Sequence, residues 1–179
     1  MRILMVGAGG VGSSAALIAA RRDFFEHMVV ADYAKNRAQA PVDRIGDDRF
    51  SALQIDASDA QAVAQACRDN AITHVLNVVD PRFVVSIFEG AFLAGADYLD
   101  TAMSLSHKHP DQPYELTGVK LGDDQFAMSD AWAAKGRLAL VGIGVEPGLA
   151  DVFARYASDN LFSAIDELGV RDASDMVVS

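Results

Sequence analysis

The fold of this chain is decided by the stretch Val6-Gly7-Ala8-Gly9-Gly10-Val11-Gly12. An apolar run at residues 3–6 leads into it, and an alanine-rich segment at residues 13–20 follows it. This order predicts a strand, a tight turn and a helix. The glycines stand at the three positions of the G-x-G-x-x-G fingerprint, which is typical of dinucleotide-binding proteins.

The fingerprint residues have different expected roles. Gly7 permits the sharp turn off the strand, and Gly9 lets a pyrophosphate approach the backbone where no Cβ stands in the way. Gly12 lets the helix lie close against the sheet. The free N–H groups at the start of the helix, at Gly10 and Val11, would bind the phosphates with the help of the helix dipole.

A second apolar run, residues 29–31, ends in Asp32, which follows Gly12 by 20 residues. An acid at this distance is placed to accept hydrogen bonds from the adenosine ribose. Asp32 favours NAD, because its carboxylate repels the 2′-phosphate of NADP. Lys35 and Arg37 could reach such a phosphate or could simply be solvated, so NADP stays open as an alternative.

Apolar runs alternate with helical patterns along the chain. We expect strands at residues 3–6, 29–31, 50–55, 74–79, 98–99 and 138–141. We expect helices at residues 13–20, 34–40 (ended by Pro41), 59–69, 83–94, 123–135 and 149–161. This alternation predicts an α/β fold of the Rossmann type, a doubly wound parallel sheet with strand order 3-2-1-4-5-6.

The end of the chain predicts the start of a second domain. Residues 1–148 would form the dinucleotide-binding domain, and residues 149–179 would form a connecting helix and the first strands of another α/β domain. Residues 164–170 are expected to be a strand and residues 176–178 the start of its hairpin partner. A hairpin that stops in mid-strand exposes a sheet edge, so we expect the polypeptide to continue.

In an open parallel sheet the ligand crevice lies beyond the carboxyl ends of the strands. The adenosine half of a dinucleotide would lie against the fingerprint and against Asp32, Tyr33, Asp56 and Ala57. The middle of the cofactor would border Val78, Val79 and Asp80. The nicotinamide and substrate side would lie near Asp100, Thr101, Gly144 and Glu146. For Asp56 and Asp100, capping of a turn or helix is an equally good interpretation.

Charge and composition exclude several classes of protein. The net charge of −10 argues against nucleic acid as a partner. Six Lys and Arg against four Asp and Glu give residues 1–45 a charge of +2, which leaves −12 on residues 46–179. The single cysteine, Cys67, is expected in the core, and no metal site is predicted. Without an apolar run of membrane length or room for a signal peptide, we expect no membrane partner and a cytoplasmic location.

Several segments resemble the saccharopine dehydrogenase family, which includes lysine 6-dehydrogenases and carboxynorspermidine dehydrogenases. Besides the opening stretch, they are Val29–Asp32, Ile55–Asp59, Tyr98–Thr101 and Gly142–Gly148. The chain departs from the family pattern at Asp80-Pro81-Arg82 and in the polar loop of residues 104–123. Both departures lie where substrate would enter, so they leave the substrate open.

The resemblance implies an NAD(P)-dependent oxidoreductase that acts on C–N bonds of an amino acid or imine-derived secondary amine. It also implies a homodimer formed through a second domain, and an active site that residues 1–179 do not complete. No general acid or base stands out, and Asp100, Thr101 and Glu146 are the candidates nearest the substrate. The alternative is a regulatory domain that senses NAD or another nucleotide without turnover.

Overall fold

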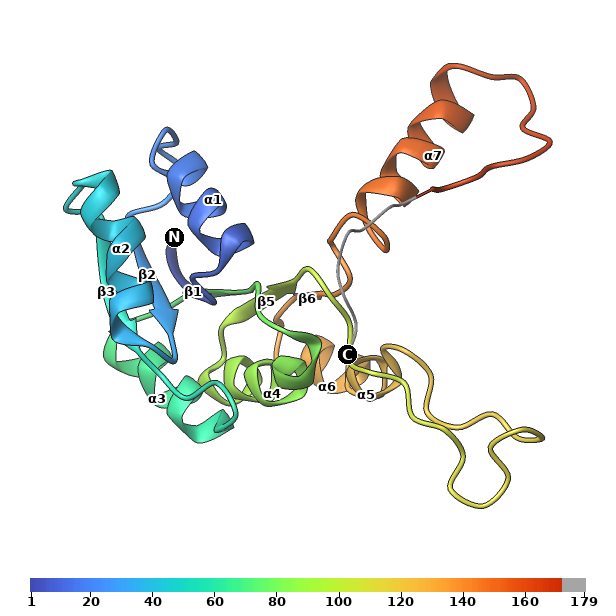
Figure 1. The fold of residues 1–179 in the computed structure, drawn as a ribbon, viewed down its shortest axis with the longest axis horizontal. Coiled ribbons are helices and arrows are strands. Elements are labelled where there is room, and N and C mark those ends of the chain that lie inside the picture. The colour runs from blue at the N-terminus through green and yellow to red at the C-terminus, as the bar shows by residue number, and fades with distance from the viewer. Residues whose placement is uncertain (172–179) are drawn as a thin grey trace.

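The structure is a computed structural model that describes residues 1–171. Six parallel strands form one sheet in the order β3-β2-β1-β4-β5-β6, which confirms the predicted order and the Rossmann-type fold (Figure 1). The strands are β1 (Arg2–Val6), β2 (His27–Asp32), β3 (Phe50–Gln54), β4 (His74–Asn77), β5 (Asp97–Asp100) and β6 (Ala139–Leu140). The order reverses between β1 and β4, so ligands are expected at the carboxyl ends of these two strands.

Helices cover both faces of the sheet (Figure 1). On one face lie α1 (Gly10–Ala19) and α2 (Lys35–Ile45), packed on apolar residues of β1 and β2. On the other face lie α3 (Ala60–Asp69), the 3-10 turn η1 (Pro81–Phe83), α4 (Val84–Ala94), α5 (Asp123–Phe126) and α6 (Ser129–Ala134). Strands buried on both faces explain why β1 and β2 are continuous apolar runs instead of alternating ones.

The expected end of the second helix at Pro41 is wrong. Helix α2 continues through Pro41, which is buried, and ends at Gly46, whose φ of +63° allows the left-handed cap. The proline ring costs one helical hydrogen bond, and its burial in the fold offsets that loss.

The helix expected at residues 123–135 is also wrong as a single element, because it is divided into α5 and α6. The amide of Met128 bonds to the carbonyl of Gln125, three residues back, which tightens the turn between them. Trp132 on α6 then packs on Phe88 and Phe92 of α4.

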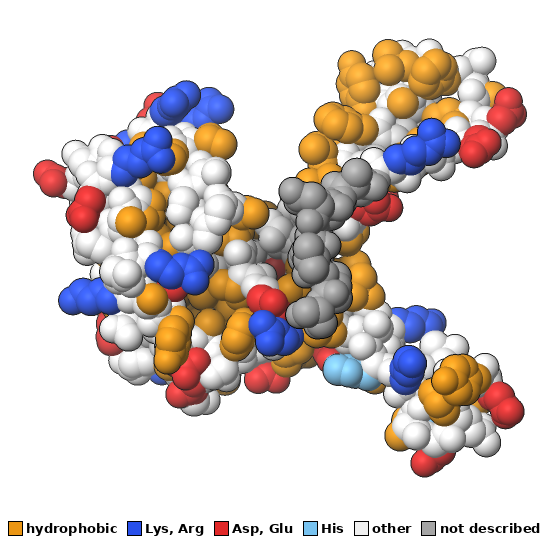
Figure 2. Space-filling view, viewed as in Figure 1, with side chains coloured by type: hydrophobic (Ala, Val, Ile, Leu, Met, Phe, Trp, Pro, Cys, Tyr) orange, Lys and Arg blue, Asp and Glu red, His pale blue; other side chains and the backbone are white. Residues whose placement is uncertain are grey.

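The strand expected at residues 164–170 is not formed. After α7 (Leu149–Asn160) the chain continues to residue 171 without a strand, because no neighbouring strand within residues 1–171 pairs with it. Residues 176–178, the expected partner, lie outside the described residues. Helix α7 buries none of its side chains and projects from the body (Figure 1). Apolar side chains gather on α7 and residues 161–171, which together form an arm (Figure 2).

Among the helices of residues 1–171, none has the length and hydropathy that a membrane span needs.

Candidate functional site

A cleft of about 370 Å³ opens at the carboxyl ends of β1, β2, β3 and β4. Nine residues that the sequence indicated for the cofactor line it: Gly7, Gly9, Asp32, Tyr33, Asp56, Ala57, Val78, Val79 and Asp80. Four further lining residues are Val6, Arg37, Ile55 and Phe83. The cleft therefore lies where the rule for open parallel sheets expects a ligand.

The glycine turn forms a cradle that a side chain would fill. Gly7 has a φ of +109°, and a Cβ there would lie 2.7 Å from Cγ1 of Val79. A Cβ on Gly12 would overlap the carbonyl oxygen of Gly7. A Cβ on Gly9, by contrast, would make only an ordinary van der Waals contact, with Nη2 of Arg37 at 3.6 Å. These glycines fit the close approach of a pyrophosphate to the backbone.

Helix α1 starts directly at the cradle. Its N-cap is Gly9, which offers no side-chain hydrogen bond to the first turn. The amides of Gly10, Val11 and Gly12 therefore donate to no capping side chain, and they have no acceptor within the helix either. Val11 is 61% exposed. Free amides at the positive end of a helix suit an anionic ligand.

Asp32 ties the cradle to the end of β2. Its Oδ2 accepts a hydrogen bond from the amide of Ala8 at 3.0 Å, and its Oδ1 accepts one from the amide of Ala34 at 3.0 Å. Asp32 is 8% exposed. Asp32 therefore has a structural role in addition to any contact with a ribose.

Arg37, on the first turn of α2, supplies positive charge to the cleft. Its Nε lies 3.8 Å from Oδ1 of Asp32. Lys35, the other cation considered from the sequence, is not among the lining residues. A guanidinium binds phosphate oxygens through two parallel N–H donors. Arg37 is thus placed to contact a 2′-phosphate beside the ribose.

Two carboxylates stand on the rim of the cleft. Hydrogen bonds from the side chain and backbone of Ser58 lower the pKa of Asp56, and the side chain of Arg82 does the same for Asp80. Both carboxylates are therefore charged at neutral pH. Ile55 and Phe83 add apolar surface to the lining of the cleft, which suits the face of an adenine. Ile55 directly follows the end of β3, and that position is the signal that could have found it, whereas Phe83 lies in η1.

The substrate-side candidates lie outside the lining of this cleft. Thr101 and Gly144 are neighbours, because a Cβ on Gly144 would overlap the carbonyl oxygen of Thr101. Glu146 is exposed on the loop of residues 142–148. Asp100 is 1% exposed and directs both oxygens at protein donors instead of a ligand space. The structure thus brings Thr101 and Gly144 together and buries Asp100.

Burial raises the pKa of Asp100 above its ordinary value. Hydrogen bonds from Gly142, Gln125 and Tyr98 act in the opposite direction, because they stabilise the charged form. Asp100 is therefore a buried acid held by its neighbours, and sequence spacing could not reveal partners 25 and 42 residues away.

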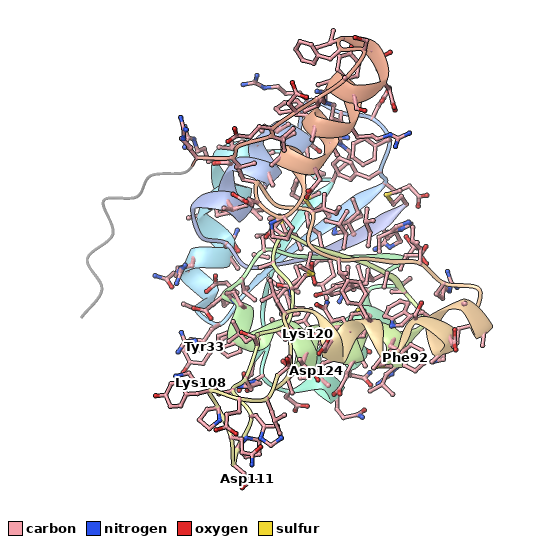
Figure 3. The ribbon with its side chains drawn as sticks, turned by 90° about the vertical axis from the view of Figure 1, so that its right-hand side faces the viewer. Tyr33, Phe92, Lys108, Asp111, Lys120 and Asp124 are labelled. Atoms are coloured by element: carbon pink, nitrogen blue, oxygen red, sulfur yellow. The ribbon has the colours of Figure 1, made fainter. Side chains whose placement is uncertain are left out.

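Cys67 and the polar loop of residues 104–123 are not part of the lining of the cleft. Cys67 belongs to the core, and burial raises the pKa of its thiol to about 12. Figure 3 shows Lys108 and Asp111 on a loop that projects from the body, and an isolated bridge joins His107 to Val119 at its base. Within residues 1–171, no three His, Cys, Asp or Glu side chains are grouped as a metal site would require.

Comparison with known proteins identifies a matching family model and two similar proteins. Residues 3–140 match the family model described as the saccharopine dehydrogenase NADP binding domain. A carboxyaminopropylagmatine dehydrogenase of Synechocystis is 28% identical over 97% of this chain and 42% of its own length. A carboxynorspermidine synthase of Vibrio cholerae is 30% identical over 96% of this chain and 43% of its own length. The chain thus spans less than half the length of these relatives.

A solved structure has the same fold. The saccharopine dehydrogenase (L-Glu forming) of Saccharomyces cerevisiae superposes with a TM-score of 0.67 at 19% identity. The superposition covers 89% of this chain and 31% of the yeast chain. It supports the Rossmann-type architecture described above.

Proposed function

The chain belongs to the saccharopine dehydrogenase family through its NADP-binding domain, and on that premise we propose that it is the cofactor-binding part of an NAD(P)-dependent dehydrogenase. The reaction would make or oxidise a C–N bond of an amino acid or secondary amine. The observation that supports this proposal most is a cleft lined by the glycine cradle, Asp32 and Arg37. The two similar proteins are, in addition, named for carboxy-substituted amines.

The cleft residues then have specific roles. The amides at the start of α1 would bind the pyrophosphate, Asp32 the adenosine ribose and Arg37 a 2′-phosphate on that ribose, and Ile55 and Phe83 would contact the adenine. The nicotinamide would supply or accept the hydride. The carboxyl ends of β4 and β5 would orient it, with Thr101, Gly144 and Glu146 toward the substrate. The charge of −12 on residues 46–179 would attract a cationic amine.

The remaining parts of the proposal concern the whole protein. Residues 1–148 would form the cofactor domain, and residues 149–179 would lead to a domain that completes the substrate pocket and forms a homodimer. The relatives, which are more than twice as long as this chain, support this division. We further propose a cytoplasmic location, which cell fractionation would test.

Two measurements on one preparation of residues 1–179 test the function. Calorimetric titration should show binding of NADPH or NADH, and an assay with lysine, saccharopine and carboxynorspermidine should show no turnover. Absence of binding by both cofactors at millimolar concentration would contradict the cofactor site. Robust turnover would show that the catalytic groups lie within residues 1–179, against the proposed division of labour.

The regulatory alternative makes a different prediction. If the domain only senses a nucleotide, the complete natural polypeptide should bind NADPH or NADH and oxidise none of these amines. Turnover by that polypeptide would support the dehydrogenase.

A further inference from the structure

A chain of buried hydrogen bonds connects the cofactor cleft to the loop of residues 142–148. Asn77, the last residue of β4, accepts a bond on Oδ1 from the amide of Val79 at 3.2 Å, and Val79 lines the cleft. Nδ2 of Asn77 donates to the Tyr98 hydroxyl at 2.9 Å. That hydroxyl donates to Oδ2 of Asp100 at 2.9 Å. Oδ1 of Asp100 accepts a bond from the amide of Gly142 at 2.6 Å.

A branch of this network reaches a second loop. Nε2 of Gln125 on α5 donates to Oδ2 of Asp100 at 2.7 Å, and Oε1 of Gln125 accepts a bond from the amide of Ser104 at 2.8 Å. The backbone carbonyl of Asp100 also accepts a bond from the amide of Ile143 at 2.9 Å. One buried carboxylate therefore fixes both segments that follow β5 and β6.

Packing alone does not explain these polar groups. Asn77, Tyr98, Asp100 and Gln125 are 1–3% exposed, and burying a carboxylate is costly unless donors surround it. The ring of Tyr98 already packs edge-on against Phe88 at 5.1 Å, so its hydroxyl is not needed for the core. Every bond of the network that leaves these side chains ends on a backbone amide of the cleft or of a loop.

We propose that Asn77, Tyr98 and Asp100 are positioning residues for the nicotinamide half of the cofactor. Their hydrogen bonds fix the position of the loop of residues 142–148 relative to Val79. The surface that would contact the nicotinamide is therefore formed before the cofactor binds. The inference rests on the proposed function, because it requires the nicotinamide to extend from Val79 over β5 toward this loop.

The test separates the two halves of the cofactor. Tyr98→Phe keeps the aromatic ring and removes the hydroxyl that joins Asn77 to Asp100. Calorimetric titrations use NADPH and 2′-phospho-ADP-ribose, which has the same adenosine and phosphates but lacks nicotinamide. We expect Tyr98→Phe to weaken NADPH binding about tenfold, equivalent to about 1.4 kcal/mol, and to leave 2′-phospho-ADP-ribose within about twofold of the wild type.

Two further variants complete the design. Tyr114→Phe, in a residue that is 93% exposed, removes a hydroxyl outside the network and should change neither affinity. Gln125→Met removes only the branch and should produce a smaller loss that is again confined to NADPH. Gln125→Met also keeps the test decisive if Tyr98→Phe does not fold.

Three results would overturn the inference. Equal losses for both ligands would indicate general loosening of the fold, and unchanged NADPH affinity would show that the network positions nothing. A wild type that binds both ligands equally well would show that the nicotinamide makes no contact to be positioned. A wild type that binds neither ligand would instead remove the proposed cofactor site itself.

Discussion

Two side chains of opposite charge, Asp32 and Arg37, meet where the adenosine ribose is expected, 3.8 Å apart. The carboxylate is almost fully buried and accepts a hydrogen bond from the amide of Ala8, whereas the guanidinium is largely exposed. Asp32 therefore has a fixed position, and Arg37 is free to turn toward a ligand. The choice between NAD and NADP depends on which of the two meets the 2′-position.

Replacement of Arg37 tests that choice. Arg37→Ala should weaken NADPH binding by about 1.5–3 kcal/mol, the usual contribution of a charged hydrogen bond, and should leave NADH binding nearly unchanged. Calorimetric titration with both cofactors measures the difference. Lys35→Ala on the same helix turn, but outside the cleft lining, is the control. An equal loss for NADH and NADPH would show that Arg37 contacts something other than the 2′-phosphate.

Asp32→Ala gives the opposite pattern. It should weaken NADH binding by about 1.5–3 kcal/mol through loss of the charged bond to the ribose, and it should weaken NADPH binding less or strengthen it. Because Ala8 loses its acceptor, the melting temperature of the variant is measured beside the two titrations. NADPH affinity that falls as far as NADH affinity would argue against Asp32 as the ribose ligand.

The sequence pattern predicts the position of the cleft, but it does not predict the contacts of the individual side chains near it. Asp32 is the last residue of a strand, and Gly7, Gly9 and Asp56 follow strand ends. Parallel strands bring such positions to one edge of the sheet whatever the side chains are. Asp100 is likewise the last residue of a strand, but its burial depends on Gln125 and Gly142. Those contacts are made by loops whose course has no periodic signal, so they could not be predicted.

Helices α3 and α4 approach closely at one glycine. A Cβ on Gly90 would lie 2.6 Å from Cβ of Val63 and 2.8 Å from the carbonyl oxygen of Ala60. Because one of these neighbours is backbone, the two helices would have to move apart to make room. Gly90 is therefore a packing requirement inside a helix, where alanine would otherwise be preferred.

Gly90→Ala should destabilise the protein by about 1–3 kcal/mol, despite a gain of up to about 1 kcal/mol in helix propensity. Urea unfolding followed by circular dichroism gives the free energy of unfolding. Gly10→Ala is the matched control for stability, because a Cβ at Gly10 meets nothing within 4 Å. A Gly90→Ala variant as stable as the wild type would mean that the α3–α4 contact adjusts without cost.

Elements with their own periodicity or turn residues were predicted well, and those that depend on neighbours were not. Asp59 caps α3 and Gly95 ends α4 through local chemistry that the sequence displays. Residues 164–170 have the composition of a strand, yet a strand also needs a partner edge. The local preference of proline predicts a helix end at Pro41, whereas the burial of Pro41 in the fold favours a helix that continues through it.

Residues 1–171 form a compact sheet with two helical layers and an arm that consists of α7 and residues 161–171 (Figures 1 and 2). The cofactor cleft uses residues between Val6 and Phe83, and α7 buries none of its side chains. The amides of Leu149 and Ala150 donate to the carbonyls of Gly144 and Val145, so the start of α7 is bonded to the loop of residues 142–148.

A protein limited to residues 1–148 should therefore retain cofactor binding. We expect the same affinity for NADPH as in residues 1–179, and a melting temperature lower by less than about 4 °C, because few interactions are lost. Thermal unfolding and calorimetry on both proteins make the comparison. A large fall in affinity would show that the arm contributes to the cofactor site, which the lining of the cleft does not indicate.

The aromatic cluster at α4 and α6 gives the molecule an intrinsic optical reporter. Trp132 is the single tryptophan of the chain, 3% exposed, with its ring 5.0 Å from Phe88 and 5.4 Å from Phe92. An indole in such an apolar setting emits at shorter wavelength than one in water. Its emission should shift to longer wavelength when α6 separates from α4. Fluorescence therefore reports unfolding at the β6 end of the sheet, while NADPH titrations report the state of the cleft at the β1–β4 end.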